Sequence, residues 1–270
     1  MKVLAVVGSQ PRHLYLIKAL LDSNVAVRAI VMQRESLTPS VPNGTSKEDA
    51  VNFVRHFHER ASLELSEFGC TEVRRLLHAV NHLVVDDWEL NSVKVCDFVS
   101  KEHDDIGVVF GSDMIREPLL SQLPADTINM HLGLSPRYRG SATLFWPFYF
   151  LEPQYCGATF HKLLLEPDAG DVLHQICTEL KSGDGIHDVG IRTVNQATTD
   201  LLHLINSFQH GWSYQMQKST GRNFLSRDFL PQHLRVIYNL YSNNIVDEFL
   251  AGNLGTSSPN IVKALNLGME

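Results

Sequence analysis

The sequence predicts an α/β fold: a doubly wound, Rossmann-like, mostly parallel sheet with flanking helices and a small C-terminal appendage. Two observations predict it. Apolar, β-branched runs alternate with helical segments from residue 2 to about residue 131, which is the pattern of consecutive βαβ units. Two strand-like runs then follow each other without a helix between them, and a long amphipathic helix comes next. We therefore expect a main domain over residues 1–210 and an appendage over residues 211–270.

The first half of the chain contains the parallel units. Pro11 suits the first turn of a helix, and Ser46 can cap another helix, with Asp49 three residues later. The expected elements, in order, are a strand at 2–8, a helix from 11 to about 22, a strand at 26–32, a helix from 46 to about 78, a strand at 82–85, a helix at 91–100, and strands at 106–111 and 127–131.

The second half changes pattern. Residues 156–164 and 172–180 are strand-like, and the helix from 184 to about 208 has apolar residues at helical spacing. In the tail, residues 221–224 resemble a strand or turn, a helix is expected from Pro231 to about 241, and a last helix at 245–250.

The composition is that of an ordinary globular protein, with 44% hydrophobic and 20% charged residues and a formal net charge of −7. An acidic chain without a basic stripe argues against a long nucleic-acid partner. No segment has the length of a membrane span or the form of a secretory signal, so a cytoplasmic protein is expected. The four cysteines, Cys70, Cys96, Cys156 and Cys177, show no disulfide or zinc pattern and are expected to be reduced.

Four histidines lie at spacings that can suit a metal ion. His78 and His82 are four residues apart, and His56 and His58 lie close together, but neither pair has a further ligand at a convincing spacing. We expect solvated helix residues at these positions and no metal site.

The candidate chemistry lies at the end of the strand at 127–131. Asn129 and His131 are two residues apart, so their side chains point to the same face of the strand. In open parallel sheets, ligands bind at the carboxyl ends of strands. An amide donor beside an imidazole suits a developing oxyanion and a moving proton, although either residue alone is more often structural.

Three motifs together resemble a family. They are Asn129-Met-His131, the loop Leu134-Ser-Pro-Arg-Tyr-Arg-Gly140, and Glu166-Pro-Asp168-Ala-Gly-Asp171. In order and spacing they are similar to the folate-dependent formyltransferases, a family that includes methionyl-tRNA formyltransferase, glycinamide ribonucleotide formyltransferase and the sugar N-formyltransferases. The resemblance covers residues 1 to about 205. Ser135 departs from the pattern, where the family often has a second Leu.

The resemblance implies a catalytic triad of Asn129, His131 and Asp168 and a formyl donor, 10-formyltetrahydrofolate. Asn129 is expected to donate to the oxyanion, and His131 is expected to be held in its charged form by Asp168. Asp168 is also expected to position a water that takes a proton from the attacking amine. The folate pocket that the resemblance implies is formed by Ser112, Asp113, Met114, Ile115, Leu165, Gly170 and Asp171. An ordinary helix N-terminus is an equal interpretation of residues 112–115.

The acceptor is predicted from weaker features. The short tail and the loop at 137–140 look most like the nucleotide-sugar N-formyltransferases, whose acceptor is a nucleotide-linked amino sugar of the kind found in lipopolysaccharide O-antigen. The substrate-binding residues implied are Arg137, Tyr138, Arg139, Gly140 and Arg222, with an arginine meeting the diphosphate.

Other acceptors remain open. They are hydroxyornithine and glycinamide ribonucleotide, although the loop after the first strand has a single Gly. Methionyl-tRNA is disfavoured by the net charge and the short tail. A formyltetrahydrofolate hydrolase, in which water replaces the amine, is the alternative from another class, and a silent folate- or nucleotide-binding protein is argued against by the intact triad. A homodimer is left open.

Overall fold

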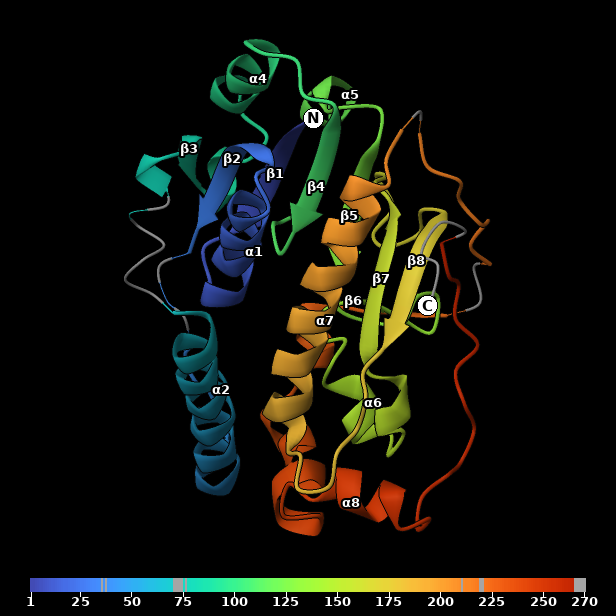
Figure 1. Ribbon diagram of the computed structural model, residues 1–270. Helices are drawn as coiled ribbons and strands as arrows, with labels where there is room; N and C mark the ends of the chain where they lie inside the picture. The colour runs from blue at the N-terminus through green and yellow to red at the C-terminus, as the bar shows by residue number, and fades with distance from the viewer. Residues whose placement is uncertain are drawn as a thin grey trace.

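A seven-stranded sheet in the order β3-β2-β1-β4-β5-β7-β8 forms the centre of the computed structural model (Figure 1). The structure describes residues 1–34, 36, 38–69, 75, 77–209, 211–218 and 221–264. Cys70, the expected helical stretch at 70–74 and the expected boundary residue 210 lie outside the described residues. The described cysteines, Cys96, Cys156 and Cys177, are free thiols.

Four strand pairs of the sheet are parallel, and the two pairs at one edge are antiparallel. β1 pairs in parallel with β2 and β4, β2 with β3, and β4 with β5; β7 pairs antiparallel with β5 and β8. The strands are β1 Lys2–Gly8, β2 Ala26–Gln33, β3 Asn81–Asp86, β4 Ile106–Phe110, β5 Thr127–His131, β7 Gly157–Lys162 and β8 Val172–Cys177. The predicted doubly wound, mostly parallel sheet is confirmed, and its order reverses between β1 and β4.

Helices cover both faces of the sheet, as a fully buried parallel sheet requires. On one face α1 and α7 pack on a core that includes Leu16, Phe110 and Leu201; on the other, α4 and α5 pack on a core that includes Val6, Val95 and Leu119. The helices are α1 Pro11–Asp22, α2 Lys47–Phe68, α4 Val93–Ser100, α5 Leu119–Gln122, α6 Trp146–Tyr149, α7 Ile186–Asn206 and α8 Ile245–Leu250.

Local sequence signals place several helix ends correctly. Pro11 opens α1, and the Ser46 hydroxyl accepts the backbone N–H of Asp49, as expected for a helix cap. Asn91 does not cap α4; its side chain instead bridges to the loop after β4, accepting from Arg116 N and donating to Met114 O. Residues 112–116 are not helical, so the helix-N-terminus interpretation of 112–115 is wrong, and α5 begins only at Leu119.

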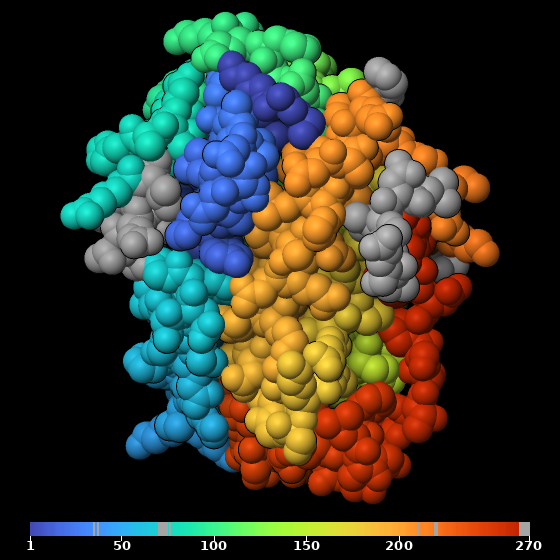
Figure 2. Space-filling view, viewed as in Figure 1, coloured from blue at the N-terminus to red at the C-terminus, as the bar shows by residue number. Residues whose placement is uncertain are grey.

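The C-terminal segment shares a core with the main domain. β9 (Arg222–Phe224) pairs in parallel with β6 (Tyr138–Gly140) in a second, two-stranded sheet. Phe224, Leu234, Ile237 and Ile245 pack in one cluster with residues of α2, α6 and α7. Figure 2 shows α2 and α7 side by side, with the C-terminal segment closing the base of the molecule.

The helix expected from 231 to about 241 differs from the observed structure. It is a 3₁₀ turn at Pro231–His233 followed by a π-helix at Val236–Leu240. The wider π turn places two adjacent residues, Ile237 and Tyr238, in the core together. Further on, the chain returns along the sheet edge, where Gln175 N donates to Val262 O at 2.7 Å.

Candidate active site

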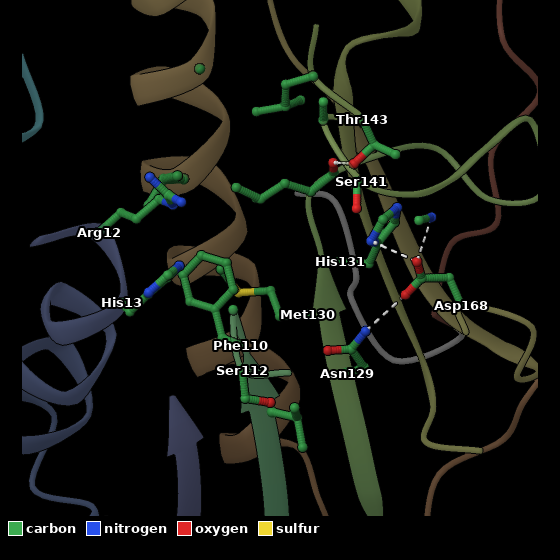
Figure 3. A pocket seen from close by; sticks show the side chains of 18 of the residues that line it. Arg12, His13, Phe110, Ser112, Asn129, Met130, His131, Ser141, Thr143 and Asp168 are labelled. Carbon is green, nitrogen blue, oxygen red and sulfur yellow. Dashed lines mark hydrogen bonds and ion pairs between the residues drawn. The ribbon is translucent and has the colours of Figure 1, made fainter. Parts of the chain in front are cut away.

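A cavity of about 540 Å³ opens at the carboxyl ends of β1, β4 and β5, where the strand order reverses (Figure 3). This is the usual place for a ligand in an open α/β sheet. The volume lies within the range of small-molecule sites. Asn129, His131 and Asp168 all line the cavity, so the structure brings the three predicted catalytic residues together.

Asp168 is the centre of this group. Asn129 Nδ2 donates to Asp168 Oδ1 at 3.1 Å, and the backbone N–H of Gly140 donates to Oδ2 at 2.8 Å. His131 Nδ1 lies 3.3 Å from Oδ2. Asp168 has a φ of 49° and Gly140 a φ of 89°. At Gly140 a Cβ atom would meet the carbonyl oxygen of Phe224 at 2.2 Å, so this donor position requires glycine.

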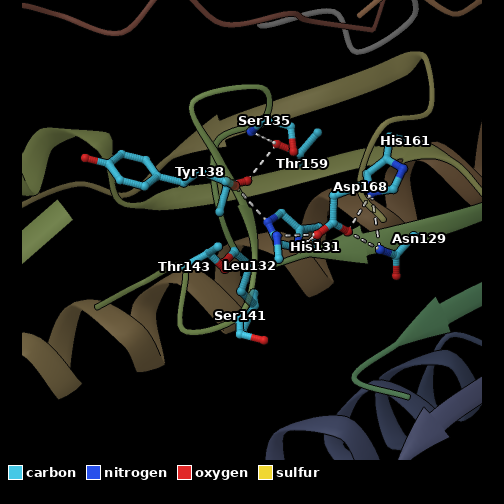
Figure 4. A network of polar contacts seen from close by, with 12 residues as sticks. Asn129, His131, Leu132, Ser135, Tyr138, Ser141, Thr143, Thr159, His161 and Asp168 are labelled. Atoms are coloured by element: carbon cyan, nitrogen blue, oxygen red, sulfur yellow. Dashed lines mark hydrogen bonds and ion pairs between the residues drawn. The ribbon is translucent and has the colours of Figure 1, made fainter. Parts of the chain in front are cut away.

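His161 on β7 is a fourth member that the sequence analysis missed (Figure 4). The register of β5 and β7 pairs Asn129 with His161. His161 Nε2 is 3.2 Å from Asn129 Nδ2 and 3.3 Å from Asp168 Oδ1. One sequence signal for His161 exists, because it lies in the strand just before the Asp168 loop. The sequence spacing does not show that this strand pairs with β5, which is what places His161 opposite Asn129.

The ring of His131 has defined neighbours on both nitrogens. Nε2 is 2.9 Å from the carbonyl oxygen of Tyr138, which can only accept, so Nε2 carries a proton. Nδ1 faces Asp168. Burial lowers the pKa of His131 below its ordinary value, although the Asp168 carboxylate opposes this shift. Burial therefore opposes the charged form of His131 that the sequence analysis expects, whereas the carbonyl beside Nε2 and the carboxylate beside Nδ1 favour it.

Asp168 itself is ionised at neutral pH. Burial favours its neutral acid, but the charge of His131, the hydrogen bond from His161 and the N–H of Gly140 together hold the pKa of Asp168 well below its usual range. The result is an anchored carboxylate between the imidazole rings of His131 and His161.

The side chain of Asn129 is turned toward Asp168. Its Nδ2 meets the carboxylate and His161, while its oxygen lies on the cavity side in Figure 3. His161 Nδ1 lies 3.0 Å from the carbonyl oxygen of Lys162, which can only accept, so Nδ1 carries a proton. The amide donor expected to face the oxyanion is therefore engaged within the protein, because a carboxylate is the strongest acceptor within reach.

The residues expected to form the folate pocket fall into two groups. Ser112, Asp113, Met114, Ile115 and Leu165 line the cavity. Gly170 and Asp171 do not. Gly170 packs so closely on β7 that a Cβ atom would lie 1.8 Å from the Lys162 carbonyl oxygen, and Asp171 accepts the backbone N–H of Gln217 at 3.3 Å. Both serve the loop rather than the cavity wall.

The residues expected to bind the acceptor mostly lie elsewhere. Among them only Gly140 lines the cavity. Arg137 is held by Glu152 at 2.6 Å, and the buried Tyr138 donates its hydroxyl to the same carboxylate. The guanidinium of Arg139 is 3.7 Å from Glu166. The guanidinium of Arg222 lies over the ring of Phe224, 4.7 Å from its centroid.

Two other arginines border the cavity. Arg12 at the start of α1 and Arg60 on α2 both approach Glu64, Arg12 by a hydrogen bond and Arg60 at 3.8 Å. Burial and the neighbouring Arg12 lower the pKa of Arg60 to about 10. His13 packs edge-on against Phe110 with ring centroids 4.8 Å apart. The cavity thus has a cationic side that the sequence analysis did not identify.

A second pair of histidines lies where α2, α7 and the C-terminal segment meet. His56 and His187 line the cavity with ring centroids 4.5 Å apart, and both approach the Tyr238 hydroxyl, at 2.9 and 3.4 Å. The expectation that His56 is a solvated helix residue is wrong, because α2 turns it inward, where it is 5% exposed. His58 and His78 are exposed, and His82 approaches the carbonyl of Val80 at 2.9 Å.

Within the described ranges, no group of three or more metal-ligating side chains is arranged to hold a metal ion. In the same ranges, no helix is both long and apolar enough to cross a membrane.

Comparisons with known proteins point to one family. The chain is 26% identical over 183 residues to methionyl-tRNA formyltransferase from Borreliella burgdorferi, a match that covers 67% of this chain and 56% of that protein. The chain thus spans little more than half the length of this relative. No protein-family model matches the chain.

Two solved structures illustrate the shared fold. Glycinamide ribonucleotide transformylase 1 from Symbiobacterium toebii aligns with a TM-score of 0.54 at 15% identity, over 81% of this chain and 94% of that one. The sugar 3N-formyl transferase WlaRD, crystallised in the presence of dTDP and 5-N-formyl-THF, aligns with a TM-score of 0.52 at 14% identity, over 85% and 71%. The chain is thus similar in sequence to a methionyl-tRNA formyltransferase and similar in fold to solved formyltransferases.

Proposed function

We propose that the protein is an N-formyltransferase that moves a formyl group from 10-formyltetrahydrofolate to the amino group of a nucleotide-linked amino sugar. One observation carries the proposal: an ionised, buried Asp168 is held among Asn129, His131 and His161 at the wall of a ligand-sized cavity. Strongly perturbed groups gathered in a cleft are typical of catalytic sites.

The residues beside this group fit a folate. Met114, Leu164 and Leu165 line the cavity and are 42%, 45% and 52% exposed. These three large apolar side chains can therefore pack against an apolar face of a bound ligand. Residues 112–115, which form neither helix nor strand, add backbone polar groups that suit the edge of a flat heterocycle. Bound there, the folate supplies the formyl carbon, and the chain's own residues do the rest.

His131 is the group that moves the proton. In its neutral form, with Nε2 donating to the Tyr138 carbonyl, Nδ1 is the basic atom and can take the proton that the attacking amine loses. Asp168, 3.3 Å from Nδ1, then stabilises the imidazolium. The same Nδ1 can return the proton to the departing folate nitrogen.

Asn129 stabilises the oxyanion after a small rearrangement. When an N–H of the neutral attacking amine donates to Asp168, the carboxylate gains a new partner and Nδ2 of Asn129 is released to donate to the formyl oxygen. Catalytic hydrogen bonds often reach their final geometry only with substrate bound. A single such donor contributes about 10²–10³ in kcat.

The acceptor assignment rests on charge. Arg12 and Arg60 border the cavity and suit the diphosphate of a nucleotide-linked sugar, and they replace Arg137 and Arg222 as the candidates for that contact. The structural neighbour crystallised with dTDP acts on a sugar, which supports the same class. A cytoplasmic role on O-antigen precursors, and a homodimer, remain expectations from the resemblance.

A second acceptor is favoured by a different observation. The sequence relative acts on methionyl-tRNA, so that substrate must be tested beside the amino sugars. The net charge of −7 disfavours it.

The test supplies 10-formyltetrahydrofolate with a panel of nucleotide-linked amino sugars, hydroxyornithine, glycinamide ribonucleotide and methionyl-tRNA, and follows tetrahydrofolate release. We expect turnover that requires an amino sugar and that Asn129→Ala reduces at least 100-fold, the scale of a lost oxyanion donor. Equal turnover without any amine would show a hydrolase instead, and turnover with methionyl-tRNA alone would replace the proposed acceptor.

A further inference from the structure

The C-terminal segment reaches the cavity itself. Phe229, which follows the 3₁₀ turn at Ser226–Asp228, lines the cavity together with Phe57 of α2 and Phe145 before α6. The Phe229 ring packs edge-on against Phe145 and Phe57, with centroids 4.7 and 6.0 Å away. Four segments far apart in the sequence, including α7 with His187, therefore form one aromatic surface, which we call the aromatic wall: Phe57, Phe145, Phe229, His56 and His187.

The rings of this wall are themselves uncharged, and the Arg60 guanidinium borders them over Phe57, 4.8 Å from its ring centroid. His56 and His187 are 5% and 7% exposed. Burial lowers the pKa of both rings, in His187 to about 3, and the nearby Arg60 lowers both further. The groups that face the pair from neighbouring elements are Tyr238, Arg55 and Arg60. Near neutral pH both rings are therefore neutral, and the wall offers apolar ring surface to a ligand.

One continuous stretch of chain joins the wall to the catalytic group. Residues 140–145 all line the cavity, beginning at Gly140, which donates to Asp168, and ending at Phe145. The C-terminal segment holds this stretch in place: Ser141 N donates to Phe224 O at 2.7 Å, and the Ser141 and Ser226 hydroxyls are 2.9 Å apart. The proposed folate-facing residues, 112–115, Leu164 and Leu165, come from other loops.

We propose that the C-terminal segment determines acceptor specificity, with Phe229 and the aromatic wall binding an uncharged, apolar-faced part of the acceptor while its amine lies at Asp168. This rests on the proposed formyl transfer for the reaction, but not for the binding. Two parts of a nucleotide-linked amino sugar have such a face: the base, and a deoxy-sugar ring that carries a methyl group. Because apolar surface is what the wall recognises, a hydroxyl in place of the methyl weakens binding.

The kinetic test compares Phe229→Ala and Phe229→Leu with the control Phe150→Ala. Phe150 is 45% exposed, packs against Trp146 and Phe224, and does not line the cavity. With the amino sugar that supports turnover, we expect Phe229→Ala to raise the acceptor KM about 10-fold or more, a typical penalty for lost apolar contact. The acceptor KM of Phe229→Leu is expected to lie between those of wild type and Phe229→Ala. The KM for the folate is expected to be unchanged in both variants. An acceptor KM within twofold of wild type, or equal rises for folate and acceptor, overturns the proposal.

A binding test stands apart from turnover. Saturation-transfer NMR with thymidine, a methyl 6-deoxyhexoside and its 6-hydroxy counterpart is run on the full chain without folate. Binding of thymidine or of the deoxyhexoside that Phe229→Ala abolishes and Phe150→Ala retains supports the wall, and identifies the base or the sugar as its occupant. Binding of all three probes unaffected by Phe229→Ala, or of none, overturns it. If no amine supports turnover but this binding pattern holds, the proposed reaction fails and the wall does not.

Discussion

Two pairs of histidines line the same cavity, and their surroundings make them chemically different. His131 and His161 face the Asp168 carboxylate, whereas His56 and His187 share only the Tyr238 hydroxyl. Burial lowers the pKa of three of these rings, but only His131 has an anion that resists the shift. A carboxylate partner thus makes a buried histidine ready for proton transfer, and its absence makes a histidine part of a wall.

Removal of the Asp168 carboxylate is expected to have the largest effect on the difference between the two histidine pairs. Asp168→Asn keeps the shape but leaves His131 without its counter-charge, so we expect kcat to fall by about 10²–10³, the scale of a lost electrostatic contact in a transition state. The matched control is Asp171→Asn, three residues away and outside the cavity. Steady-state kinetics with an amine acceptor measure both, and similar losses in the two variants would contradict the assigned role.

The pH dependence sharpens the role of His131. The neutral ring is the active form and its pKa is lowered, so activity is expected to be full at pH 7 and to fall only as the pH drops below about 6.5, its unperturbed value. The profile of kcat/KM from pH 4.5 to 8 reports this group in the free enzyme. Activity that instead falls as the pH rises through this range would mean that His131 works in its charged form.

The second pair is expected to control stability rather than rate. The pKa of His187 is lowered to about 3 in the folded protein, whereas in the unfolded chain it is near 6.5. Between pH 6.5 and pH 3 the unfolded state therefore binds more protons than the folded state. Stability is therefore fully present above about pH 6.5 and is lost as the pH falls. The slope is at most about 1.4 kcal/mol per pH unit for one such group.

His187→Phe tests this slope. The variant keeps a ring in the wall and removes the titrating group, so urea denaturation at pH 5 and pH 7 is expected to show a smaller difference in unfolding free energy than for wild type. His203→Phe, on the same helix, is the matched control. An unchanged slope in His187→Phe would assign the acid sensitivity to other groups.

The smallest effect is expected at charges outside the cavity. Arg137 pairs with Glu152 at the surface with 52% of its side chain exposed, and such pairs contribute about 1 kcal/mol or less. Arg137→Ala is expected to leave the acceptor KM within twofold, whereas Arg60→Ala raises it clearly. Thermal denaturation confirms folding of both variants, and the reverse order of effects would restore Arg137 as a substrate contact.

Local sequence patterns predict most of the fold and part of the candidate active site. The strands predicted at 2–8, 26–32 and 127–131 follow from apolar, β-branched runs and from the alternation of elements. The shared face of Asn129 and His131 follows from the two-residue repeat of a strand. Asp168 was reached through its motif. His161 was missed because its place beside Asn129 depends on the antiparallel register of β5 and β7, which no local signal specifies.

Long-range packing explains the other omissions. Local sequence signals correctly place His56 in a helix, but they do not show that it is buried. Its burial in the aromatic wall depends on contacts with His187 of α7 and with Tyr238. Phe229 lies in a tail expected to be an appendage, yet it borders the cavity. Arg137 and Arg222 matched a motif, but Glu152 and the Phe224 ring engage them away from the cavity.

The most direct test follows the formyl carbon itself. With ¹³C-formyl-labelled 10-formyltetrahydrofolate and a nucleotide-linked amino sugar, NMR distinguishes a formamide product from free formate. The account predicts that the label appears in a formamide with the wild-type protein and that Asp168→Asn transfers it at least 100-fold more slowly, as expected for loss of a transition-state contact. Label that appears only as formate, or a formamide formed equally fast by Asp168→Asn, would contradict it.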